Sequence, residues 1–129
     1  IKEKILFDPA LNKFGMGEDQ LFFSKLRKKG YKIFWSKNLR VVEKSHSHRL
    51  GINWIINRSY RLGIIGCYID KNLYGVIFGS FINYLKLFIY FFSGLLFLLK
   101  IDKSTNLIFR SFGRFLGPFV FKKIDFFKK

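Results

Sequence analysis

A chain of 129 residues is long enough for one domain with a modest core. Its single cysteine, Cys67, excludes an internal disulfide framework and a cysteine-rich zinc site. Its formal net charge of +16 points to anionic partners, either lipid head groups or nucleic acid.

The positive charge flanks an almost uncharged segment. Residues 1–72 carry +9 and residues 100–129 carry +6, whereas residues 73–99 carry only the charge of Lys86. Nucleic-acid-binding domains usually gather their charge on one face of a soluble fold. Basic flanks around an apolar segment are instead typical of binding to anionic lipid. The distribution therefore favours a membrane partner.

The first expected helix runs from Glu18 to Lys29, after a turn at Asp8-Pro9 and before Gly30. Acids in a first helical turn are stabilised by unpaired amides and by the positive end of the helix. Leu21, Phe22 and Leu26 are expected to hold this helix against a core, which would fix the direction of the acids. An acid pair alone is also a common helix cap.

Two short strands are expected next. Residues 31–36 alternate in a period of two, and residues 40–43 are expected to form a second short strand. An amphipathic helix should then run from Gly51 to about Ile65. The spacings of four and three among Trp54, Arg58 and Arg61 place these side chains on one face of that helix.

The apolar segment 73–99 is long enough for one tilted membrane span. Lys86 divides it into two runs that are each too short to cross, and basic charge on both flanks opposes a single crossing. We therefore expect an in-plane or re-entrant helical hairpin, with Lys86 extending to the head groups, and keep the single span and a soluble buried helix as alternatives. Residues 107–121 interleave phenylalanines with Arg110 and Arg114, which is typical of an interfacial helix or of one packed on a core.

A series of residues between about Ile5 and Gly63 resembles the family-2 glycosyltransferases, in particular the bacterial exopolysaccharide enzymes of the succinoglycan glucosyltransferase type. The matching residues are Phe14, Gly17-Glu18-Asp19, Phe22 or Phe23, Leu26-Arg27, Gly30, Ile33-Phe34-Trp35-Ser36, Val41-Val42-Glu43, Arg49, Trp54, Arg58, Arg61 and Gly63. Phe112 to Gly117 is also similar to the tails of that group.

The resemblance implies an α/β fold. Residues 1–66 would be the C-terminal part of a GT-A-like (Rossmann-like) catalytic domain, and residues 67–129 a membrane-associated helical tail. The chain would be a C-terminal portion, inactive alone, of an enzyme at the cytoplasmic face of the bacterial inner membrane. A divalent metal, Mg or Mn, is expected in the complete enzyme. Its ligands would lie mainly in a preceding half, since no two aspartates here are spaced as Asp-x-Asp.

The implied reaction transfers a sugar from a nucleotide-sugar donor to a lipid-linked or glycan acceptor in surface polysaccharide synthesis. An acceptor hydroxyl must lose its proton as it attacks, so a carboxylate must lie within hydrogen-bond reach. Asp19 is the candidate base, and Glu18 would orient the acceptor. The nucleotide diphosphate leaving group needs cations. Arg58 and Arg61 are candidates for that role, although both could instead face anionic lipid.

Further substrate-binding candidates are Trp54 as a wall of the site, Arg49, and Glu43, whose role the resemblance alone implies. His46 and His48 are spaced so that an extended segment could bind metal, but exposed or structural histidines are the simpler interpretation. Two other classes stay open: a small non-catalytic basic membrane-associated protein, and a nucleic-acid-binding module, for which no base-stacking motif is present.

Overall fold

The computed structural model describes residues 6–34, 36, 38, 40–42 and 51–126, and these residues are mainly helical. A short 3₁₀ helix, η1 (Pro9–Phe14), precedes α1 (Glu18–Lys28). Three longer helices follow: α2 (Ile52–Tyr74), α3 (Val76–Leu96) and α4 (Ile101–Phe126). The expected helix at 18–29 is confirmed, and the expected helix at 51–65 forms the first two thirds of α2.

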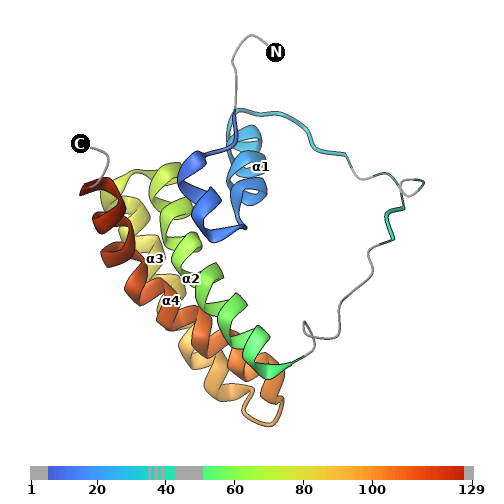
Figure 1. Ribbon diagram of the computed structural model, residues 1–129, viewed down its shortest axis with the longest axis vertical. Helices are drawn as coiled ribbons and strands as arrows, with labels where there is room; N and C mark the ends of the chain where they lie inside the picture. The colour runs from blue at the N-terminus through green and yellow to red at the C-terminus, as the bar shows by residue number, and fades with distance from the viewer. Residues whose placement is uncertain (1–5, 35, 37, 39, 43–50, 127–129) are drawn as a thin grey trace.

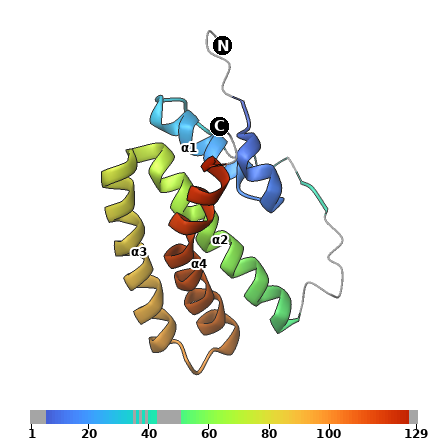
Figure 2. The ribbon, with the colours of Figure 1, turned by 60° about the vertical axis from the view of Figure 1, so that its left-hand side comes forward.

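Helices α2, α3 and α4 form an up–down–up bundle, in which α2 and α4 run parallel and α3 runs antiparallel to both (Figures 1 and 2). Gly75, at a φ of 82°, is the only residue between α2 and α3, so the chain reverses sharply there. Residues 97–100 connect α3 to α4 at the opposite end of the bundle. Helices η1 and α1 lie beside the half of α2 that is nearer to Gly75 (Figure 1). The bundle therefore supports the turn that leads into Glu18 and Asp19, which we call the acid-bearing turn.

Glycines bring α2 and α4 into backbone contact. A Cβ atom on Gly63 would overlap the carbonyl oxygen of Arg110, and one on Gly113 would overlap the carbonyl oxygen of Tyr60. One turn further along, a Cβ atom on Gly117 would lie 2.6 Å from the Cβ of Cys67. Small residues at helix interfaces allow this close approach, which is common among helices packed in membranes.

The apolar core lies where η1 and α1 meet the bundle. Its buried members are Leu11 and Leu21 from the N-terminal elements, Ile64, Ile65, Ile69 and Leu73 from α2, and Phe121 from α4. Leu21 is almost completely buried, and Phe22 and Leu26 are half-buried, so the expected direction of α1 against a core is confirmed. This core fixes the start of α1 relative to α2.

Along the rest of the bundle, polar side chains are buried and apolar side chains are exposed, which is the reverse of the usual arrangement in a soluble protein. The buried polar residues of the described chain are Ser59, Asp70, Asn83, Ser104, Ser111 and Arg114, all on the three long helices. The outer surface of α3 is instead apolar and exposed, through Val76, Ile77, Phe78, Phe81, Tyr84, Leu85, Phe88, Ile89, Phe92, Leu95 and Leu96. On α4, Arg114 is 4% exposed whereas Phe119 is 63% exposed. We call this exposed surface of α3, together with Phe112, Phe115 and Phe119 of α4, the outer apolar face.

The expected α/β fold with a GT-A-like (Rossmann-like) domain is wrong, because no strand or sheet occurs among the described residues. The described parts of the two expected strands, 31–34 with 36 and 40–42, have no regular structure. Val41 and Val42 are 94% and 91% exposed, so neither packs on a core. An alternating pattern indicates a strand only where a neighbouring strand can complete its hydrogen bonds and a layer can cover its apolar side. The described chain provides neither.

The expected hairpin within residues 73–99 is also wrong in its re-entrant form. Helix α3 continues without a break through Lys86. The ammonium group of Lys86 lies 2.7 Å from a carboxylate oxygen of Asp70 instead of extending to head groups. The expected domain boundary between residues 66 and 67 falls inside the continuous helix α2.

Candidate functional site

Two glycines shape the turn that carries the acid pair. Gly15 ends η1 at a φ of 59°, and Gly17 caps α1 at a φ of 92°. A residue other than glycine is strained at such φ angles. Gly17 is also confined, because a Cβ atom there would overlap the side chain of Ile65 on α2. The turn therefore rests directly on α2.

A hydrogen bond joins the same turn to α2 at a second point. The Nη1 atom of Arg61 donates to the carbonyl oxygen of Phe14 over 3.1 Å. Arg61 was expected to bind phosphate, and the structure gives it a contact with the backbone just before the acid pair. Since Arg61 and Ile65 are one turn apart on α2, both attachments hold the acids over the same stretch of helix.

The two acids occupy different environments at the start of α1. Asp19 is exposed, and its Oδ1 accepts a hydrogen bond of 2.7 Å from the backbone amide of Gln20. Glu18 is half-buried, and its Oε2 atom is inaccessible and has no hydrogen-bond partner. Asp19 is thus accessible to a substrate proton, whereas Glu18 holds an unsatisfied acceptor beside it.

Trp54 and Arg58 form a pair on the first turns of α2. The guanidinium carbon of Arg58 lies 4.9 Å from the centre of the Trp54 ring, which is a cation–π contact. Arg58 is exposed and Trp54 is half-buried. With Arg61 one turn later, the expected common face of Trp54, Arg58 and Arg61 lies on α2, next to the acid-bearing turn at its Arg61 end.

Other expected site residues lie outside the described part of the chain. These are Glu43 and Arg49, the matching residue Trp35, and the stretch that contains His46 and His48. Among the residues that the structure describes, no three His, Cys, Asp or Glu side chains are grouped as a metal site would require. The described side chains therefore do not by themselves make a site for the divalent metal expected in the complete enzyme.

A second polar cluster, which the sequence analysis did not single out, lies between the three long helices. The Asp70 carboxylate accepts from Lys86 on α3 and from Arg114 on α4, each over 2.7 Å. The same Nη1 of Arg114 donates over 2.9 Å to the Oδ1 of Asn83. One carboxylate thus joins two cations from two neighbouring helices.

Pro118 explains why Asn83 is part of this cluster. A proline within a helix has no amide hydrogen for the carbonyl four residues earlier, which is that of Arg114. The Nδ2 of Asn83 donates to this carbonyl oxygen over 3.2 Å, so the amide group of Asn83 binds both the backbone and the side chain of Arg114. An asparagine in an apolar helix, and a proline four residues after a basic residue, are the sequence signals that could have revealed the cluster.

Cys67 is buried between α2 and α4. Burial raises the pKa of its thiol, and the positive charges of Lys71 and Arg114 only partly oppose this effect. The thiol therefore stays protonated near neutral pH, and a protonated thiol is a poor nucleophile. Cys67 is therefore a small buried side chain at the contact between α2 and α4.

A scan against protein families, a search of curated proteins and a search of solved structures each find no match for this chain. The geometry of the two clusters is therefore the basis for a functional assignment.

Proposed function

We propose that this chain takes part in glycosyl transfer at a membrane surface, from a nucleotide-sugar donor to a lipid-linked glycan acceptor. The proposal rests on the way in which the acid pair is held against α2. An exposed Asp19 lies in the first turn of α1, and the turn before that helix is attached to α2 through Ile65 and Arg61. A base must be held in position to be effective, and these attachments supply that rigidity.

The proposed reaction uses the chain's own side chains as follows. Asp19 accepts the proton of the acceptor hydroxyl while the hydroxyl oxygen bonds to the anomeric carbon of the sugar. The bond between that carbon and the diphosphate oxygen breaks, and its electron pair leaves with the nucleotide diphosphate. Arg58 and Arg61 stabilise the charge that develops on the diphosphate. Glu18 orients the acceptor hydroxyl.

Other parts of the proposal remain as the sequence predicts them. Trp54 would form a wall of the site beside Arg58, and Glu43 and Arg49 would contact substrate. A divalent metal, with ligands supplied mainly by a preceding part of the enzyme, would counter the diphosphate charge when bound. The donor sugar is not specified by these residues.

The inverted distribution of side chains supports a membrane location. Helix α3 is long and apolar enough to span a membrane, a property that it shares with the core helices of soluble proteins. Such core helices are mostly buried, whereas only 11% of the most apolar window of α3 is buried. Exposed apolar surface of this extent marks an interaction surface, and buried ionic groups that pair with one another are typical of helices in membranes. We propose that the chain lies at the cytoplasmic face of the membrane, as the basic flanks of the sequence predict.

The test is Asp19→Asn in membranes from cells that express the natural protein containing residues 1–129. Transfer to a lipid-linked acceptor should fall by about 10² to 10⁴ while donor binding is retained, which is the usual effect of losing a general base. Asp102→Asn is the matched control, because Asp102 is also an exposed acid in the first turn of a helix. Transfer at the same rate in both variants would contradict the role of Asp19.

The outer apolar face equally favours a second candidate, a non-catalytic membrane-associated protein. That candidate predicts membrane binding with no transfer that depends on Asp19. The same pair of variants therefore separates the two functions.

A further inference from the structure

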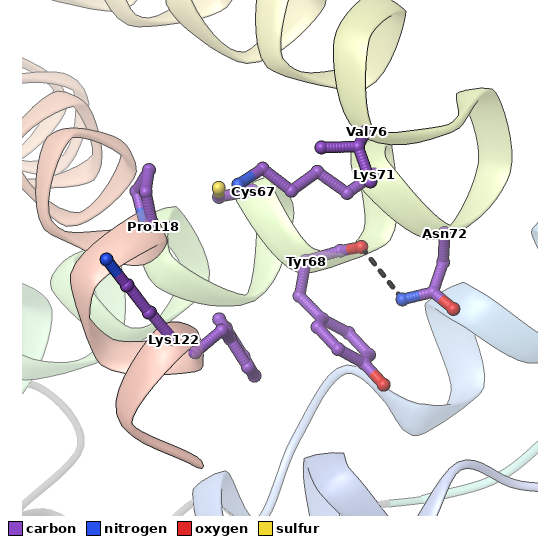
Figure 3. A pocket seen from close by; sticks show the side chains of 8 residues that line it. Cys67, Tyr68, Lys71, Asn72, Val76, Pro118 and Lys122 are labelled. Carbon is purple, nitrogen blue, oxygen red and sulfur yellow. Dashed lines mark hydrogen bonds between the residues drawn. The ribbon is translucent and has the colours of Figure 1, made fainter. Parts of the chain in front are cut away.

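An open cleft of about 520 Å³ lies at the end of the bundle where α2 turns into α3. Its lining includes Cys67, Lys71 and Asn72 of α2, Val76 of α3, and Pro118 and Lys122 of α4. Figure 3 shows these side chains around the space between α2 and α4. None of them belongs to the proposed transfer site.

The walls of the cleft are held firmly. The close approach of Gly117 to Cys67 brings α4 against α2 on one side. The rings of Tyr68 and Phe121 stack with their centres 4.4 Å apart, and the Tyr68 hydroxyl donates to Asp8 over 2.8 Å. The cleft is thus built from packed helices.

The cleft contains two lysines, Lys71 and Lys122, that are not paired with a described acid. Neither Lys71 nor Lys122 forms an ion pair with a carboxylate in the described part of the chain. Asp70, next to Lys71 in sequence, is already bound to Lys86 and Arg114. An anionic ligand between the two lysines would therefore supply the missing negative charge.

The same cleft has an apolar side that continues onto the outer apolar face. Val76 lines the cleft and is also the first residue of that face. Pro118 lines the opposite wall, next in sequence to the exposed Phe119. Cations beside a continuous apolar surface suit a ligand with an anionic head and a hydrocarbon tail.

We propose that this cleft binds the phosphate head group of an anionic membrane lipid. Lys71 and Lys122 hold the phosphate, and the acyl chains lie along the outer apolar face beyond Val76. A soluble phosphate compound would leave the apolar side of the cleft uncovered, so the continuity of the two surfaces favours the lipid. The site does not depend on the proposed transfer reaction.

The test compares two double variants that lose the same charge. K71Q/K122Q removes the cleft lysines, whereas K13Q/K100Q removes two exposed lysines elsewhere. The natural chain and each variant are titrated with phosphatidylcholine vesicles that either contain or lack phosphatidylglycerol, and the fraction of protein bound to the vesicles is measured. Since a lysine near an anionic surface contributes about 1 kcal/mol, the cleft variant should bind the anionic vesicles about 30-fold more weakly than the natural chain. It should bind them at least about tenfold more weakly than the control variant.

Three outcomes would overturn the proposal. Equal losses in the two double variants would mean that the charge acts diffusely. If soluble glycerol phosphate, added at the same concentration as the lipid, displaced the protein from the vesicles, the cleft would be a site for a free phosphate compound. Failure of K71R/K122R to restore binding would show that the losses arise from altered packing. Asp19→Asn should leave lipid binding unchanged, so failure of the transferase proposal is seen separately.

Discussion

The bundle and the acid-bearing turn use their charged side chains in opposite ways. Within the bundle, the Asp70 carboxylate binds Lys86 and Arg114 and connects three helices. At the acid-bearing turn Asp19 is exposed, and so is Arg58 near the start of α2. Charged groups that are buried must be paired, whereas exposed ones remain available to a ligand. The first cluster therefore holds the bundle together, whereas the second remains available for the binding and catalytic roles that we propose.

The two regions also differ in how they are packed. Glycines place the backbones of α2 and α4 in direct contact over several turns. Helices η1 and α1 are instead attached through a small apolar patch that includes Leu11, Leu21 and Ile65. Substitutions within the bundle should therefore lower the stability of the fold, whereas substitutions at the acid-bearing turn should mainly change the proposed transfer activity.

The largest expected effect on stability is that of Asp70→Ala. It leaves Arg114 buried without its carboxylate, and breaking a buried ion pair in this way costs about 3–5 kcal/mol. Chemical unfolding in detergent micelles, followed by helical circular dichroism, measures the change. Asp102→Ala is the control, because Asp102 is exposed. A loss below about 1 kcal/mol for Asp70→Ala would mean that the cluster does not hold the bundle.

A smaller loss is expected for Gly113→Ala. The added methyl group would overlap the Tyr60 carbonyl oxygen and push α4 away from α2, and overpacking of this kind costs about 1–3 kcal/mol. Asn106→Ala places an alanine on the same helix away from that contact, and it should not destabilise the protein because alanine favours helices. The same unfolding experiment compares the two variants. Equal stability would contradict the backbone contact.

The smallest expected effect is on donor binding by Arg58→Lys and Arg61→Lys. If these arginines bind the diphosphate, a lysine cannot reproduce the planar fork, and the donor KM should rise about tenfold for each variant. Arg27→Lys, an exposed change on α1, is the matched control. An unchanged donor KM together with unchanged membrane binding would assign both arginines to lipid attraction.

Local sequence patterns were sufficient for α1, for the first part of α2 and for α4, but not for the continuous helix α3. The acids and apolar spacing after Gly17 predicted α1, the spacing of Trp54, Arg58 and Arg61 predicted the first part of α2, and residues 107–121 lie within α4. A helix satisfies its own backbone hydrogen bonds, so its formation can be predicted from residues close in sequence. The strands predicted at 31–36 and 40–43 failed because a strand depends on a partner that local sequence does not specify.

Only the tertiary structure decided which side of α4 faces inward. The pattern of Phe112, Arg114 and Phe115 predicts two different faces on α4, but periodicity alone does not say which face packs on a neighbour. That choice depends on Asp70, Asn83 and Lys86, which lie at least 28 residues from Arg114 in sequence and meet it through helix packing. Because burying a charge is favourable only when a partner is already in place, the inward position of Arg114 follows from the assembled bundle.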